Sequence, residues 1–316
     1  MAVFVMGGVI WMAGKDPVQI KDRRAVSATE VDYHILKTEG KVYHYDTSQI
    51  NFLFMGVDSA TDDMAGQADT LFLISCDRNK KEMDVISLSR DAMVPIQVFD
   101  ASGKNLGWES QHLGLAFSYG TSPEQGCRLT AEAVSRCLNH IPIIYYMASS
   151  LSSIAAFQDL VGSITVTIPG DDLAHLGEDY EKGKELTIDS SNVEMFLRTR
   201  NTQESYSNGS RMERQRVYVN AYIEKLRDQL KQDYNQTVQK MVQVSKKLVT
   251  NCSLEDMGTF AEMIMTYSFE EENYHEVVGT NQMGMFHDEY VIDEDVLQKL
   301  LLDVFYIEET ESMTKS

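Results

Sequence analysis

The chain has 316 residues, of which 43% are apolar, and this is enough for a sizeable core in one large domain or two small ones. Its formal net charge of −20 argues against a nucleic-acid-binding protein, because such proteins present a basic face. The sequence contains no repeat, CxxC pair or histidine cluster, which argues against a repeat protein and a zinc site.

The chain begins with an apolar run that ends at charged residues. Ala2–Gly14 contains only apolar or small residues and is followed by Lys15-Asp16. A spanning helix needs about 20 such residues, so the run is either a truncated membrane span or a buried strand or helix. Its glycines and tryptophan, followed at once by charges, favour the truncated span. We expect residues 1–14 to be this remnant, and residues 15–45 to be a juxtamembrane linker with a short strand region near Glu39-Gly40.

The next segment holds three strand-like runs, and each has a charged residue at one end. The runs are Asn51–Val57 before Asp58, Thr70–Cys76 after Asp69, and Val85–Leu88 before Arg90 and Asp91. Strand ends present side chains to a cleft rather than to the core of a sheet. The pattern therefore predicts a cleft that holds two carboxylates and a guanidinium.

Helices and strands alternate through the remainder of the chain. Pro95 is expected to interrupt the chain, and Trp108–Tyr119 is expected to form a loop and a short helix. Helices are then predicted from Ser122 to Leu138 and over Leu151–Val161. The other expected elements are strands at Ile143–Met147, Ile164–Ile168, Glu276–Val278 and Tyr290–Ile292, and helices capped by Ser190 or Ser191, opened by Ser210, and near Gln236–Val249, Ser253–Tyr267 and Asp293–Phe305. This order predicts an α/β fold with a layered mixed sheet flanked by helices on both faces, in one domain over 46–308 with a polar tail at 309–316.

A second charged segment contains arginine but no lysine. Residues 198–216 include Arg198, Arg200, Arg211, Arg214 and Arg216. The planar guanidinium binds phosphate through two parallel hydrogen bonds, which lysine cannot reproduce. Arg211 and Gln215 lie four residues apart and share a helix face. The group is either an anion site or a helix surface paired with the acidic remainder, and the residues alone leave both interpretations open.

Asp58 and Asp69 offer the hard oxygen ligands that suit Mg²⁺, which usually takes one or two carboxylates together with waters and substrate phosphates. The alternative is that each aspartate caps a loop. The P-loop, dinucleotide, HExxH and GxSxG motifs are all absent from the sequence. Asn208-Gly209-Ser210 matches a glycosylation sequon, and we interpret it as a loop and helix cap. Together the strand-end carboxylates and the arginines indicate a metal-assisted phosphate site.

Several of these segments resemble the LytR–CpsA–Psr family of bacterial cell-envelope proteins. The resemblance runs in consistent order from about Gln49 to Phe305, and its motifs are NFLFMGVDS, GQADTLFLIS, VISLSRDAMVPI, ITVTIPGD, LRTRN, SRMERQ and VVGTNQMGMF. Family members are anchored by an N-terminal span with the domain outside the cell. The resemblance therefore implies a single-pass cell-membrane protein with an extracytoplasmic LCP-like catalytic domain.

The resemblance also implies an activity and a set of site residues. It implies a phosphotransferase that moves a glycopolymer (wall teichoic acid, capsule or another wall polysaccharide) from a polyprenyl-pyrophosphate carrier to peptidoglycan. By the family pattern, Mg²⁺ is held by Asp58 and Asp69, and the pyrophosphate is bound by Arg90, Arg198, Arg200, Arg211 and Gln215. Apolar faces of the sheet and helices would form a groove for the lipid. We take the catalytic set to be Asp58, Asp69, Arg90 and Asp91; no motif marks the general base, and from the residues themselves we expect Asp91 or Asp69 to accept the proton.

One position departs from the family pattern. Many members carry arginine two residues before the second aspartate, where this chain has Gln67. Two alternatives to the transferase stay open, and Gln67 supports the first of them. The first is a non-catalytic envelope regulator that binds polyprenyl phosphate, and the second is a pyrophosphatase that uses water as acceptor on the same lipid.

Overall fold

The computed structural model describes residues 34–61, 64–199, 208–284 and 288–310. The expected membrane remnant at 1–14 and most of the expected linker lie outside these residues. No helix in the described ranges is both long and apolar enough to cross a membrane.

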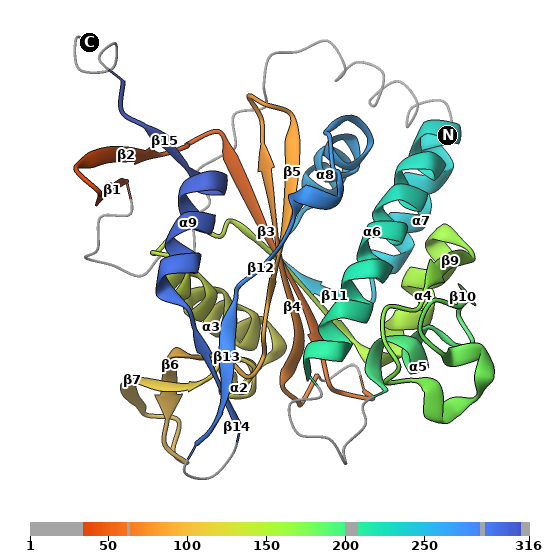
Figure 1. The fold of residues 1–316 in the computed structure, drawn as a ribbon, viewed down its shortest axis with the longest axis horizontal. Coiled ribbons are helices and arrows are strands. Elements are labelled where there is room, and N and C mark those ends of the chain that lie inside the picture. The colour runs from red at the N-terminus through yellow and green to blue at the C-terminus, as the bar shows by residue number, and fades with distance from the viewer. Residues whose placement is uncertain (1–33, 62–63, 200–207, 285–287, 311–316) are drawn as a thin grey trace.

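A six-stranded mixed sheet forms the centre of the fold (Figure 1). Its strands lie in the order β11 (Leu248–Thr250), β8 (Tyr145–Ser150), β3 (Gln49–Val57), β4 (Ala68–Asp77), β5 (Glu82–Leu88) and β12 (Tyr274–Glu276). The pairs β3–β4, β4–β5 and β8–β11 are antiparallel, whereas β3–β8 and β5–β12 are parallel. The expected mixed sheet is therefore confirmed.

Side chains alternate between the two faces of this sheet, as the strand period of two requires. On β3 and β4, Leu53 and Leu73 belong to one buried apolar cluster, and Phe52 and Phe72 belong to a second. Both faces are therefore covered, and the runs read as nearly continuous apolar sequence.

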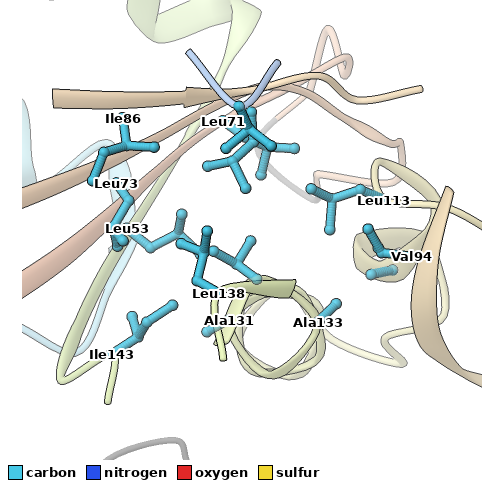
Figure 2. Close-up of a cluster of buried hydrophobic side chains, with 14 of the residues drawn as sticks. Leu53, Leu71, Leu73, Ile86, Val94, Leu113, Ala131, Ala133, Leu138 and Ile143 are labelled. Carbon is cyan, nitrogen blue, oxygen red and sulfur yellow. The ribbon is translucent and has the colours of Figure 1, made fainter. Parts of the chain in front are cut away.

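Helices cover the sheet on both sides, so the molecule has three layers (Figure 1). The first face packs against α2 (Leu115–Ser118), α3 (Pro123–Cys137) and α9 (Glu294–Phe305). Figure 2 shows part of this cluster, where Leu53, Leu71, Leu73 and Ile86 from the sheet lie beside Ala131 and Leu138 from the α3 region. The second face packs against α4 (Leu151–Val161), α5 (Val193–Arg198), α6 (Asn208–Gln232), α7 (Tyr234–Ser245) and α8 (Leu254–Thr266).

Smaller elements surround the three layers. The small sheets are β1 (Ile35–Thr38) with β2 (Lys41–Tyr45) and β15 (Tyr306–Glu308), β6 (Met93–Phe99) with β7 (Asn105–His112), β9 (Ile164–Thr167) with β10 (Glu185–Ile188), and β13 (Gly279–Met283) with β14 (Asp288–Ile292). Single 3₁₀ turns are η1 (Ala174–Leu176), η2 (Glu178–Tyr180) and η3 (Glu271–Asn273). Because β1 and β15 both pair with β2, the first and last strands of the described chain belong to one small sheet, with β2 between them (Figure 1).

Several helix boundaries follow the local signals, but α5 begins after Asn192 and not after Ser190 or Ser191, and α7 ends at Ser245 because Leu248–Thr250 pairs with β8 as β11. The Ser122 side chain accepts a hydrogen bond from the Gln125 amide and Pro123 opens α3, while Gly162 with φ of 73° ends α4. Capping side chains also start α8 at Ser253 and α9 at Asp293. The expectation for Trp108–Tyr119 was partly wrong, because its first residues lie in β7, which pairs with β6 along one edge.

Candidate active site

A β-bulge places the two predicted aspartates at one end of the central sheet. Gly56 pairs with Thr70 and Val57 pairs with Ala68, so Asp69 is the extra residue on β4. Strict alternation would put Asp69 and Thr70 on opposite faces, whereas both line the same cavity. Asp58 follows the end of β3 and lines that cavity too. The hairpin therefore brings together two carboxylates that are eleven residues apart in the sequence.

Asp58 forms an ion pair with Arg198. The distance between Arg198 Nη2 and Asp58 Oδ1 is 2.7 Å, and Arg198 Nη1 also donates to Glu194 Oε1 at 2.8 Å. The side chains of Arg198 and Asp58 are 38% and 46% exposed. An exposed pair of this kind adds little stability, so both groups remain accessible to an incoming ligand.

Asp69 is more enclosed and contacts two guanidinium groups. Its Oδ1 accepts a short hydrogen bond from Arg90 Nη1, and its Oδ2 lies 3.5 Å from Arg211 Nη1. Arg211 Nη2 also donates to the Asp69 carbonyl oxygen at 3.0 Å. The Asp69 side chain is 18% exposed and that of Arg211 is 5% exposed. Two separate segments, the turn after β5 and the first turn of α6, therefore meet at one carboxylate.

Arg90 lies between two aspartates. Its Nε donates to Asp91 Oδ1 at 3.1 Å, in addition to its bond with Asp69. Burial alone lowers the pKa of Arg90, but the Asp69 and Asp91 carboxylates outweigh it and raise the pKa above its ordinary value. Arg90 therefore keeps its charge in this partly buried position, and neither Arg90 nor Asp91 lines the cavity itself.

Gln215 lies one helical turn beyond Arg211 on α6 and faces the same cavity. Its Nε2 donates to Thr70 Oγ1 at 3.1 Å and approaches the Leu197 carbonyl oxygen at 3.5 Å. The predicted shared helix face is therefore present, and the structure brings together Asp58, Asp69, Arg90, Asp91, Arg198, Arg211 and Gln215. Arg200 lies outside the described residues.

Two other arginines of the segment serve a different purpose. Arg214 is fully buried, lies 2.9 Å from Asp172 Oδ2 and donates short hydrogen bonds to the carbonyls of Phe196 and Thr199. Burial lowers the pKa of Arg214, and the Asp172 carboxylate opposes this. Arg216 pairs with Glu213 and Glu271. Arg214 thus fixes the end of α5, where Arg198 lies, and only part of the arginine group faces the cavity.

An apolar cavity of about 270 Å³ opens at this cluster and extends between the second face of the sheet and α6. Its mouth is polar and is formed by Asp58, Asp69, Thr70, Arg198, Arg211 and Gln215. Beyond the mouth, the cavity is lined mainly by aromatic and aliphatic side chains of the strands β3, β4, β5 and β8 and of the helices α4, α6, α7 and α8. On α6 the lining residues run from Arg211 to Leu226. At a rise of about 1.5 Å per residue this span measures about 22 Å.

The strands give the same length independently. The cavity reaches from Asp69 at the start of β4 to Met83, which pairs with Cys76. At about 3.3 Å per residue the seven steps from Asp69 to Cys76 span about 23 Å. A polar mouth followed by a long apolar channel suits a ligand with an anionic head and a hydrocarbon tail.

The donor set at the mouth fits a magnesium ion bound together with phosphate. Mg²⁺ needs one or two carboxylates when waters and substrate phosphates complete its shell, and Asp58 and Asp69 provide two at one opening. Within the described ranges no group of three or more histidine, cysteine or acidic side chains is arranged to hold a metal. The arrangement is thus suited to an ion that arrives with its ligand and not to a fully protein-ligated one.

Gln67 is exposed, and its carbonyl accepts a hydrogen bond from the Asp58 amide at 2.9 Å. Its backbone therefore closes the loop that carries Asp58. Two residues that sequence reasoning missed also support the cluster: Ser89 and Asn208, which are hydrogen-bonded to each other at 3.0 Å. Nothing local could reveal this contact, because the partners are 119 residues apart.

Comparison with known families decides where the chain belongs. The sequence model of the LytR_cpsA_psr family matches residues 18–303, which is most of the chain. The chain belongs to the LytR_cpsA_psr family. The family expected from the motifs is therefore confirmed.

Relatives and solved structures of this family agree with the fold. The teichoic acid transferase TagV of Bacillus subtilis (strain 168), named a polyisoprenyl-teichoic acid–peptidoglycan transferase, is 26% identical over 215 residues, covering 64% of this chain and 52% of the relative. The crystal structure of B. subtilis TagV aligns with a TM-score of 0.62 at 20% identity, over 82% of this chain and 96% of that one. A structure of TagT bound to LI-WTA gives 0.61 at 19% identity, over 91% and 98%. This chain thus has the LytR_cpsA_psr fold and spans about half the length of that curated relative.

Proposed function

We propose that this chain is a phosphotransferase that moves a glycopolymer from a polyprenyl-pyrophosphate carrier to peptidoglycan. The observation that carries the proposal is the polar mouth, where carboxylates and guanidinium groups converge at the opening of a long apolar cavity. Relatives of the same family are named as transferases of teichoic acid from a polyisoprenyl carrier to peptidoglycan.

The donor would bind with its diphosphate at the mouth and its prenyl chain in the cavity. Arg90, Arg198 and Arg211 supply three guanidinium groups for the diphosphate, with Arg200 from the family pattern. Burial of the tail against residues such as Phe72 and Val219 contributes roughly 25 cal/mol per Å² of apolar surface removed from water. Anion recognition and tail burial together select a lipid diphosphate over either part alone.

Chemistry at the diphosphate is a displacement at phosphorus. A sugar hydroxyl of the acceptor attacks the phosphorus bonded to the glycopolymer, and the bond from that phosphorus to the bridging oxygen breaks, releasing polyprenyl phosphate. Arg90 and Arg211 neutralise charge on the leaving phosphate, which is the main requirement in phosphoryl transfer. Asp91 accepts the hydroxyl proton in this scheme, because both Asp69 oxygens already face guanidinium groups whereas Asp91 engages Arg90 through Oδ1.

Asp58 and Asp69 would hold Mg²⁺ in this scheme. When bound, the ion supplies charge neutralisation on the diphosphate oxygens and draws the head group toward the mouth. Arg198 pairs with Asp58, and with Mg²⁺ held by Asp58 the Arg198 guanidinium would be available to the diphosphate. The same proposal places the domain outside the cell, anchored to the membrane through the 1–14 segment.

Transfer from a lipid-linked oligosaccharide to peptidoglycan tests the proposal directly. Asp69→Ala removes the carboxylate that faces both Arg90 and Arg211, so we expect a loss of about 10²- to 10³-fold in rate, the usual size for one electrostatic group in an active site. Arg216→Ala is the control, because Arg216 lies on the same helix but pairs with Glu213 and Glu271. Unchanged transfer by both Asp69→Ala and Arg90→Ala would rule the assignment out.

The products of the same assay separate the other activities. A pyrophosphatase releases free phosphoglycan without acceptor, and a lipid-binding regulator gives no turnover with or without magnesium. The observation that favours transfer over these two is the naming of the family's relatives as transferases.

A further inference from the structure

A buried amide joins the first turn of α6 to the end of β5. Asn208, the first residue of α6, is 7% exposed, and its Nδ2 donates to Ser89 Oγ at 3.0 Å. Ser89 is 1% exposed, and its hydroxyl also accepts from the Asp91 amide at 3.2 Å. Because Ser89 directly precedes Arg90 and Asp91, this bond ties the helix to the turn that carries two site residues.

The other end of the same amide holds Arg211. Asn208 Oδ1 accepts from Arg211 Nη2 at 2.7 Å, and that Nη2 also donates to the Asp69 carbonyl oxygen at 3.0 Å. A guanidinium can only donate, so the amide oxygen must face Arg211 and the amide nitrogen must face Ser89. The polarity of the Asn208 side chain is therefore fixed by its two partners.

We propose that Asn208 is a positioning residue that orients Arg211 toward the diphosphate of the lipid donor; this inference rests on the proposed function. A free arginine side chain has many rotamers, and ordering them on ligand binding costs free energy. Asn208 removes part of that cost because it holds Nη2 against the Asp69 carbonyl before the donor arrives. Through its hydrogen bond to Ser89, Asn208 also fixes the position of the first turn of α6 relative to Arg90 and Asp91.

The contact chemistry predicts which substitutions keep this role. Alanine removes the hydrogen bonds to Ser89 and Arg211, while Arg211 keeps its contacts with Asp69. Aspartate keeps an acceptor for Arg211, and the Ser89 hydroxyl can turn to donate to the second carboxylate oxygen. The requirement is therefore an acceptor at the Oδ1 position and not an amide as such.

Calorimetric titration of the full chain with geranylgeranyl diphosphate in the presence of Mg²⁺ tests the inference. We expect Asn208→Ala to bind about tenfold more weakly, the usual effect of losing a hydrogen bond to a charged group. Asn208→Asp is expected to bind as the wild type does, within about threefold, since it keeps the charged hydrogen bond. Asn273→Ala is the matched control, because Asn273 is also 7% exposed but donates to Glu82 and Asp84, away from the mouth.

Ser89→Ala supplies a second test that leaves all of α6 intact. It should weaken binding in the wild-type background and weaken it less in the Asn208→Ala background, because the Ser89–Asn208 hydrogen bond is already absent there and only the bond from the Asp91 amide remains to be lost. Wild-type affinity in Asn208→Ala, additive losses in the double variant, or equal losses in Asn208→Ala and Asn208→Asp would each overturn the inference. Failure of the wild-type chain to bind the diphosphate would overturn the proposed function itself.

Discussion

The two faces of the central sheet are built from the same strands and yet differ in how they are filled. On the α3 and α9 face, the side chains of Leu53, Leu73 and Ile86 are fully buried in a continuous cluster (Figure 2). On the α6 face, Phe54 and Ile74 are only half-buried and line a cavity. Alternate residues of a single strand therefore serve two purposes, one side stabilising the fold and the other shaping a binding channel.

The difference shows where the molecule can tolerate empty space. Protein interiors are normally close-packed, and an apolar void costs contacts on every side chain that borders it. A sheet with one dense face can carry such a void on the other, because the dense face supplies the stability. This apolar cavity lies in the α6 layer, and it opens where the bulge at Asp69 places the polar mouth.

Two neighbouring residues on β4 allow the packing of the two faces to be compared directly. Leu73→Ala removes a fully buried side chain from the dense face, and we expect it to lower the free energy of unfolding by about 2–5 kcal/mol. Ile74→Ala trims a side chain that already borders empty space, so we expect a loss nearer about 1 kcal/mol. Urea titrations of both variants provide the measurement. Equal losses would show that the two faces are packed alike.

Filling the channel should leave the unfolding stability unchanged or raise it, and should weaken ligand binding. Val219→Phe puts a larger side chain into the cavity from α6, so we expect unfolding stability to be unchanged or raised by about 0.5–2 kcal/mol. Affinity for geranylgeranyl diphosphate should fall about tenfold, because the added ring takes the space of the lipid tail. Val217→Phe is the control, since Val217 is half-buried on the same helix and does not line the cavity. A Val219→Phe variant that binds normally would show that the tail does not enter this channel.

Sequence reasoning succeeded where a local pattern determines the structure. The apolar runs with a charged residue at one end predicted the ends of β3 and β5, and the caps at Ser122, Ser253 and Asp293 predicted three helix starts. β4 begins at Ala68, two residues before the expected Thr70, so Asp69 lies within the strand. The arginine-only segment left an anion site and a paired helix surface both open, and the structure contains both arrangements, because Arg198 and Arg211 line the cavity whereas Arg214 and Arg216 form ion pairs elsewhere. These signals are local because capping and strand alternation involve neighbouring residues.

The remaining features depend on contacts between distant segments. The bulge at Asp69 is set by the register of β3 against β4, and no residue type marks it. Pro95 was expected to interrupt the chain, but it lies within β6, which pairs with β7. Among the described strands β6 pairs only with β7, and Pro95 is exposed there, as proline in an edge strand can be. Asn208 was interpreted as part of a loop and helix cap. Its contact with Ser89 could not be predicted, because Ser89 lies far away in the sequence. The helix begins at Asn208 and not at Ser210.

The most direct test of the central claim is an experimental structure of this chain with geranylgeranyl diphosphate bound. We expect diphosphate oxygens within hydrogen-bonding distance of Arg90, Arg198 and Arg211, and the prenyl tail along α6 toward Leu226. A diphosphate bound away from these guanidinium groups, or a tail that lies in solvent while the cavity stays empty, would contradict it.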